Sequence, residues 1–232
     1  DVKEGEKMTR FFRALSALAA AVAAAGAHAR TVEDASGKVF EFASPPRAAT
    51  VVPSLSQEIF EIGAQDFLLG NSNYCIYPEA AKSKPRLGGL LNPDYEKIAA
   101  LKPDIFLLPL SPTGRAVARR LESVGVSAFF TNPEGAGNIS KDVALLGRVF
   151  FRDAEAERIA RGFDAELSSP GGRASGRGRR ALFMFGGMAA GRGSFVGGLL
   201  EACGLKNCAD SSGAPWPALS REFIVCLLYT SP

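Results

Sequence analysis

The sequence predicts an α/β fold built on parallel strands. Short apolar stretches alternate with segments of helical spacing through residues 48–131, as in strands connected by crossover helices. The strand-like stretches are continuously apolar rather than alternating, which is typical of a sheet covered on both faces. A second run of this kind begins near residue 181, after a region of helical spacing over 138–167 with a break at Arg152-Asp153.

The first elements are a hairpin, a buried strand and a helix. Residues 31–42 alternate around a turn at Ser36-Gly37, which predicts the hairpin. Residues 48–52 form a short apolar strand. The helix is predicted over 54–62, beginning with a Ser54-x-x-Gln57 capping pattern and ending at Gly63.

The later elements follow from apolar runs and from helical spacing. Strands are predicted at 67–71, 105–108, 127–131 and 181–185, and helices at 93–101, 113–124 and 194–203. Between them lies a Gly/Ser/Arg-rich segment at 168–180. Nucleic-acid binding is one interpretation of its arginines, but no aromatic residues accompany them, so we interpret it as a solvated loop.

The first 29 residues are predicted to comprise translated upstream sequence at 1–7 and an export signal after it. Met8 is the expected start, Arg10 and Arg13 supply positive charge, an apolar run covers 14–25, and Ala27-His28-Ala29 fits a cleavage site. The alternative is a buried alanine-rich helix, but the three features occur in the order of a signal peptide. We therefore expect a periplasmic protein.

Composition excludes several classes of function. The 232 residues carry a formal net charge of +3, too small to indicate nucleic-acid binding. The single histidine, His28, lies in the predicted leader, so an exported chain would have no imidazole for Ser-His-Asp or Cys-His catalysis. It would also have no histidine ligand for zinc, and we expect neither a metal site nor a cofactor.

The four cysteines would enter an oxidising compartment. Cys203 and Cys208 are five positions apart, so they form either a small disulfide loop or two buried thiols.

Several stretches together resemble the periplasmic substrate-binding proteins of cobalamin and ferric-siderophore ABC importers, and the last of them resembles the cobalamin branch in particular. They are Pro46-Arg47, Val51 to Glu58, Gly70, Tyr74, Tyr77-Pro78, Leu87-Gly88-Gly89, Asn92 to Asp104, Leu200 to Gly204, Asn207, Pro215-Trp216-Pro217 and Ser220-Arg221-Glu222. The resemblance implies two Rossmann-like lobes joined by a long helix, with one ligand in the cleft and an inner-membrane ABC permease as partner. It implies a monomeric binding protein rather than an enzyme.

The resemblance also divides the chain and marks its end. The parts are a leader at 1–29, a first lobe at 30–148, a linker helix at 149–172, a partial second lobe at 173–225 and a tail at 226–232. A complete second lobe needs more strands and helices than remain after Glu222. We interpret 226–232 as non-native, because one reading frame of a common sequencing adapter encodes Cys226 to Ser231.

The resemblance and the strand ends nominate ligand and docking residues. Tyr74 and Trp216 match the aromatic cleft residues of the family, and Ser54 and Leu55 follow a strand end, where ligands bind in open α/β sheets. Met188 and Gly191 are further candidates. Permease docking through one carboxylate per lobe would fall to Glu96 and Glu222.

The ligand class rests on this pattern and has alternatives. A corrinoid is the first expectation, although Gly-Gly-Leu-Leu at 88–91 and Pro109 stand where the cobalamin branch has aromatic residues. A ferric siderophore or haem is the alternative within the family. An exported carboxylate-dependent hydrolase, or an adhesion or sensor module on the same fold, is the alternative outside it.

Overall fold

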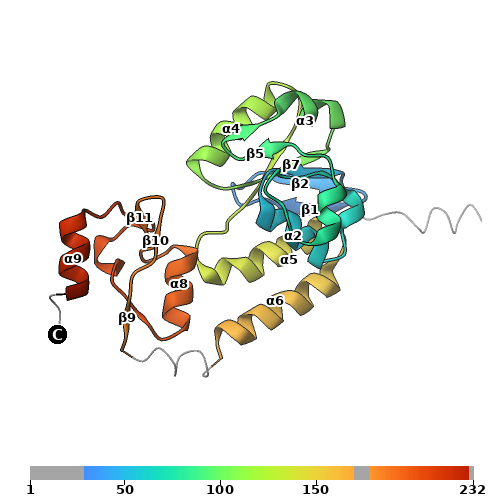
Figure 1. The fold of residues 1–232 in the computed structure, drawn as a ribbon. Coiled ribbons are helices and arrows are strands. Elements are labelled where there is room, and N and C mark those ends of the chain that lie inside the picture. Colours follow the sequence, from blue (N-terminus) through green and yellow to red (C-terminus); the bar gives the residue numbers. More distant parts are fainter. Residues whose placement is uncertain (1–28, 170–177, 230–232) are drawn as a thin grey trace, which may run out of the picture.

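The computed structural model describes residues 29–169 and 178–229. The predicted signal peptide, most of the Gly/Ser/Arg-rich segment and the last three residues of the predicted tail lie outside these ranges. Figure 1 shows the first lobe, the helices that follow it, and the second lobe to one side.

A four-stranded parallel sheet forms the centre of the first lobe. Its strands are β3 (Ala48–Thr50), β4 (Leu68–Gly70), β7 (Ile105–Pro109) and β8 (Ala128–Thr131), in the order β4-β3-β7-β8. Ala48 pairs with Leu68 on one side and with Ile105 on the other. The predicted strands of this lobe are therefore confirmed, and so is the parallel sheet.

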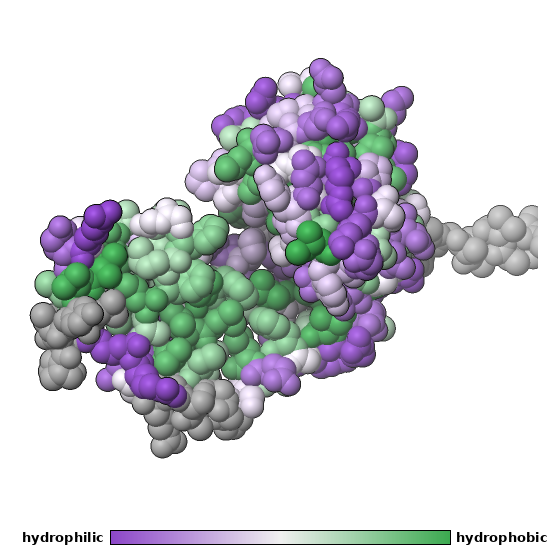
Figure 2. Space-filling view, in the orientation of Figure 1, coloured by the Kyte–Doolittle hydropathy of each residue, from purple (hydrophilic) through white to green (hydrophobic). Residues whose placement is uncertain are grey.

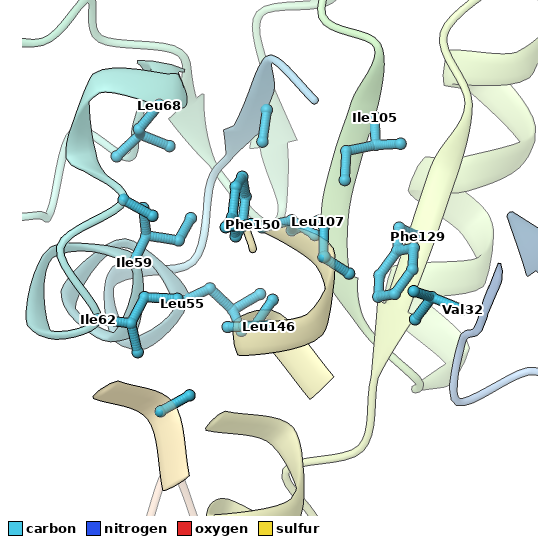
Figure 3. Packing of buried hydrophobic residues seen from close by; sticks show 14 of the residues in the cluster. Val32, Leu55, Ile59, Ile62, Leu68, Ile105, Leu107, Phe129, Leu146 and Phe150 are labelled. Atoms are coloured by element: carbon cyan, nitrogen blue, oxygen red, sulfur yellow. The ribbon is translucent and has the colours of Figure 1, made fainter. Parts of the chain in front are cut away.

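Successive side chains of these strands enter two separate cores. Ile105 and Leu107 face one core with Phe129, while Phe106 and Leu108 face the other. This alternation follows from the two-residue period of a strand. Figure 3 shows the first core, where residues from the sheet meet helix residues such as Ile59 and Leu146.

Helices cover both faces of the sheet. They are α2 (Pro53–Glu61), α3 (Tyr95–Leu101), α4 (Pro112–Glu122), α5 (Ile139–Val149) and α6 (Asp153–Leu167). Asp94 caps α3 by accepting from the backbone N–H of Lys97, and Ser111 caps α4 in the same way. α5 and α6 are separated at the predicted break.

The predicted cap of α2 is wrong. The helix begins one residue earlier, with Val52 at the N-cap position and no side-chain hydrogen bond there. Pro53 occupies the first turn, where its missing N–H costs nothing and its fixed φ favours the helix. This geometry leaves the Ser54 side chain exposed on the first turn.

A hairpin of β1 (Arg30–Glu33) and β2 (Val39–Phe42) is anchored to the sheet by one carboxylate. Buried Asp34 accepts from the backbone N–H groups of Ser36 and Lys38 through Oδ1. Its Oδ2 accepts from the N–H of Phe130 in β8 at 3.0 Å. The Asp34 carboxylate thus accepts hydrogen bonds both from its own turn and from a strand 96 residues away.

The second lobe is made of short pieces. β9 (Arg180–Ala181) pairs in parallel with β12 (Lys206–Asn207), and β10 (Met184–Phe185) pairs antiparallel with β11 (Met188–Ala189). The predicted single strand over 181–185 is therefore wrong. Gly186 and Gly187 both have positive φ and fold residues 184–185 back onto 188–189.

The second lobe also contains two helices, α8 (Phe195–Ala202) and α9 (Arg221–Tyr229). The remaining elements are β5 (Gly88–Gly89), β6 (Asn92–Pro93) and the 3-10 helices η1 (Gln65–Phe67), η2 (Glu79–Ser83), η3 (Ala136–Asn138) and η4 (Asp210–Ser212). Figure 2 shows apolar side chains gathered over the second lobe, and Phe185 is 70% exposed there.

A buried carboxyl pair lies where α2 packs on α5. Oε2 of Glu58 makes no hydrogen bond within the described part of the chain. Burial, and then the negative charge of Asp142, raise the pKa of Glu58 to about 8. Burial also raises the pKa of Asp142 to about 6, although that carboxylate accepts from the N–H of Asn132. The raised pKa favours the neutral form of Glu58.

Replacement of a buried aliphatic side chain in the first core should destabilise the fold. Ile59 is fully buried on α2, so Ile59→Ala should lower the free energy of unfolding by about 2–5 kcal/mol, because a cavity replaces packed methylene groups. Urea denaturation measures this change. Ile76→Ala is the matched control, since Ile76 is 74% exposed, and equal losses in the two variants would contradict the packing described above.

The Glu58 carboxyl should make stability depend on pH. An acid whose pKa is raised by folding contributes stability at low pH, and this contribution is lost as the pH rises through the folded pKa. Between pH 6 and 8 we expect stability to fall by on the order of 1 kcal/mol per pH unit in the wild type. Glu58→Gln should flatten this slope.

Chemical denaturation at several pH values is the measurement. Glu61→Gln removes an exposed carboxyl from the same helix and should leave the slope in place. A wild-type slope unchanged by Glu58→Gln would show that another group causes it.

Candidate ligand-binding site

The carboxyl ends of the parallel strands define where a ligand can approach the first lobe. From β3 the chain passes to β4 on one side and then crosses to β7 on the other. Ligands of open α/β sheets bind outside such a reversal point. The segments that follow β3 and β4 meet the β5–β6 hairpin there.

These segments enclose a shallow groove of about 300 Å³, which we name the Tyr74 groove. It is lined by Val51, Val52, Pro53, Tyr74, Gly89, Leu90, Leu91 and Asn92. None of these side chains carries a charge, and only those of Tyr74 and Asn92 are polar. The groove therefore presents an apolar, uncharged wall with an aromatic ring, suited to one face of a large ligand.

Glycine determines how Tyr74 lies in the groove. A Cβ at position 89 would lie 2.7 Å from Cε2 of the Tyr74 ring, so the ring packs directly on the hairpin backbone. Ser72 supports the loop, because its hydroxyl accepts from the Tyr74 N–H and donates to the Gly88 carbonyl. Tyr74 is still 69% exposed and available for contact.

An arginine braces the loop from beneath. The Arg86 guanidinium donates from Nη1 to the carbonyls of Ser72 and Cys75 at 2.6 and 2.9 Å, and to Oδ1 of Asn71 at 3.1 Å. Buried Asn71 in turn donates to the Ala81 carbonyl. Neither residue was singled out from the sequence, because their partners lie 10–15 positions away in an irregular segment.

Apolar side chains also project from the segments around the groove. Leu91, at the tip of the β5–β6 hairpin, is 88% exposed, and Ile76 and Tyr77 are exposed on the Tyr74 loop. Large apolar groups held on ordered loops gain from being covered. Leu91 belongs to the Gly-Gly-Leu-Leu stretch at 88–91, where the resemblance to the cobalamin branch predicts an aromatic residue.

The second-lobe candidates are only partly as predicted. Met188 is exposed on β11 and bridges to Ala218, two positions after the half-buried Trp216. Gly191 is buried, and a Cβ there would lie 2.3 Å from the Ala214 carbonyl oxygen. The glycine thus permits a close approach of two backbone segments rather than of a ligand, so its predicted role is wrong.

Ser54 and Leu55 do not join the Tyr74 groove. Leu55 lies in the first core with Ile59 and Ile62, on the buried stripe of α2, so its predicted ligand contact is wrong. Ser54 instead lines a second depression of about 450 Å³ between the lobes, which we name the hinge groove. Its lining is Ser54, Gln57, Glu58, Glu61, Pro133, Ile139, Val143, Ile159 and Phe195.

The two predicted docking carboxylates occupy equivalent places in their helices. Glu96 lies in the first turn of α3 and Glu222 in the first turn of α9, and both are exposed. Hydrogen bonds from the Glu222 backbone N–H and from the Ser220 hydroxyl hold the pKa of Glu222 below its usual range. The two predicted docking carboxyl groups thus both lie at the surface, one on each lobe.

Cys75, Cys203 and Cys208 are free thiols. Cys203 is exposed at the end of α8 and Cys208 is buried after β12, so the disulfide considered from their spacing is not formed. Within the described ranges, no three His, Cys, Asp or Glu side chains come together as a metal site. No helix in those ranges combines the length and apolar character needed to cross a membrane.

Comparison with known sequences gives one family. The model of the periplasmic binding protein family matches residues 49–226. A vitamin B12-binding protein of Yersinia pestis (strain Pestoides F) is 26% identical over 183 residues, which is 77% of this chain and 65% of that protein. An equally similar vitamin B12-binding protein comes from Yersinia pseudotuberculosis (strain IP 31758). The chain thus spans about two thirds of the length of these curated relatives.

Solved structures share the fold. A periplasmic vitamin B12-binding protein of Vibrio cholerae superposes with a TM-score of 0.66 at 21% identity, over 79% of this chain and 74% of that one. A periplasmic heme-binding protein of Pseudomonas aeruginosa gives 0.67 at 22% identity, over 78% and 69%. Because the family model matches most of the sequence, the chain belongs to the periplasmic binding protein family.

Proposed function

We propose that this protein binds a corrinoid in the periplasm and delivers it to an inner-membrane ABC importer. The observation that carries this proposal is the Tyr74 groove, an uncharged apolar wall with an exposed aromatic ring at the carboxyl ends of the strands. The curated relatives are named for vitamin B12, which supports the same ligand class. The protein acts as a binder and not as an enzyme, in keeping with a family of substrate-binding transport proteins.

Ligand charge favours a corrinoid over its rivals. The edge of a corrin ring carries mainly neutral amide groups, whereas haem carries two carboxylates that need cations or strong donors when buried. The Tyr74 groove offers no basic side chain. A flat, uncharged ring can cover the apolar wall of the groove without burying a ligand charge that lacks a partner.

Haem binding is the second candidate, and one observation favours it. Arg192 is exposed on the loop after β11, with only a 3.9 Å approach to Asp210. A guanidinium in this position suits a carboxylate-bearing ligand. A solved structure that shares the fold is a heme-binding protein, which supports haem as the second candidate ligand. A ferric siderophore is the third ligand class to be tested.

Docking to the permease is assigned to Glu96 and Glu222. Each is an exposed carboxylate in the first turn of a helix, one on each lobe. Two anions on separate lobes restrict the orientation of docking, because two matching cations on a permease can engage both only when the two pairs of charges are aligned. Exposed charge pairs of this kind affect association rate and orientation more than affinity.

Binding of a corrinoid should be visible in the single tryptophan. Titration with cyanocobalamin should quench Trp216 fluorescence to saturation at one ligand per chain, while haemin and a ferric siderophore bind more weakly. Tyr74→Ala should weaken cyanocobalamin binding about tenfold, because the ring provides contact area that alanine lacks.

Tyr74→Phe is the matched variant and should bind nearly as well as the wild type, since it keeps the ring. Saturable quenching by haemin alone would replace the corrinoid with haem. Absence of quenching by cyanocobalamin, together with no thermal stabilisation, would reject the corrinoid proposal.

Charge reversal at the docking residues should impair transfer without impairing binding. Glu96→Lys and Glu222→Lys should each slow association with the ABC importer in reconstituted vesicles, about tenfold at low salt, and the difference should shrink as salt is added. Kd for the ligand should stay at the wild-type value.

Glu122→Lys, which reverses another exposed charge on the first lobe, serves as the control. Docking through Glu96 and Glu222 is contradicted if all three variants associate with the importer at the same rate.

A further inference from the structure

The two lobes touch at a point where neither provides a side chain larger than a methyl group. Helix α8 of the second lobe contacts η3, the short helix that follows β8 in the first. A Cβ at Gly198 would lie 2.9 Å from the Cβ of Ala136 and 3.2 Å from its backbone nitrogen. The backbone of α8 therefore lies directly against η3 (Figure 1).

Gly198 has no comparable purpose within its own lobe. Glycine inside a helix is less favourable than alanine, so its presence in α8 needs a reason. The neighbouring Gly197 has one within the lobe, since a Cβ there would lie 2.2 Å from the Gly191 carbonyl oxygen. The three nearest atoms at Gly198 all belong to Ala136, across the lobe boundary.

The rest of the lobe boundary is looser. Phe195 lies one turn before Gly198 on α8 and lines the hinge groove with Ile139, Val143 and Ile159. That groove has a volume of about 450 Å³, so Phe195 has space on its first-lobe side. At Gly135, a Cβ would still be 3.7 Å from the Gly193 carbonyl oxygen.

We propose that the contact between Gly198 and Ala136 sets the separation of the two lobes, and with it the width of the ligand cleft. Contact between backbone atoms cannot be relieved by a rotamer change, whereas the space at Phe195 allows adjustment. Gly198 is thus a positioning residue for the proposed ligand site. The inference rests on the proposed function only for its ligand readout, because lobe separation exists without a ligand.

The test enlarges this contact and measures the lobes directly. Spin labels are attached to exposed Cys203, at the end of α8, and to Val124→Cys, an exposed position after α4, in a Cys226→Ser background. Gly198→Leu should lengthen the distance between the labels and weaken cyanocobalamin binding about tenfold or more, as expected of an overpacked contact.

Gly162→Leu is the control. Gly162 is also a helix glycine, on α6, but nothing lies within 4 Å of the position that its Cβ would take. This variant should keep both the label distance and the ligand Kd. Equal label distances in the wild type, Gly198→Leu and Gly162→Leu would overturn the proposal.

A reciprocal pair of substitutions keeps the test informative if Gly198→Leu does not fold. Gly198→Ala should lengthen the distance slightly and weaken binding, and adding Ala136→Gly should restore much of both, since it removes the opposing methyl group. Failure of the second substitution to restore either property would contradict the proposal. If the wild type binds no corrinoid, haem or siderophore, the proposed function fails, while the label distances still decide the role of Gly198.

Discussion

Burial of one parallel sheet on both faces is the constraint on which the first lobe depends. A parallel pair leaves no polar face for water, so every strand residue needs a partner above or below it. Ile105 to Leu108 meet this demand by alternating between the two cores. Two layers of helices must then be supplied, and α2 with α5 on one side and α3 with α4 on the other supply them.

The same constraint places the candidate site. With the faces covered and the strands parallel, the carboxyl ends are the part of the sheet where irregular segments collect. Such segments need fixed hydrogen bonds to hold a ligand surface, and here Arg86 and Ser72 provide them beneath Tyr74. Gly89 then allows the aromatic ring to pack against the hairpin. Hydrogen bonds and backbone packing thus hold the wall of the groove in place.

The spacing of apolar residues predicted most strands and helices of the first lobe. It predicted little of the hydrogen bonding that holds the Tyr74 loop. The strands, the hairpin and the break between α5 and α6 follow from apolar spacing, which depends on near neighbours. Leu55 was misassigned because a residue that follows a strand end can equally belong to the buried stripe of the next helix. The structural roles of Asp34, Arg86 and Glu58 were not predicted, because these roles depend on atoms that only the fold brings together. The Phe130 N–H, which donates to Asp34, is an example.

The ligand wall and the proposed docking carboxylate of the first lobe are parts of one continuous segment. Asn92 lines the Tyr74 groove, Asp94 donates its N–H to the Leu87 carbonyl, and the Asp94 side chain then caps the helix that carries Glu96. Direct hydrogen bonds thus join the backbone beside the hairpin to the first turn of the helix that carries Glu96. In the second lobe, the close contact of Gly198 with Ala136 places α8 directly against the first lobe. The start of α3 and the position of α8 are thus each held by a short contact with the first lobe.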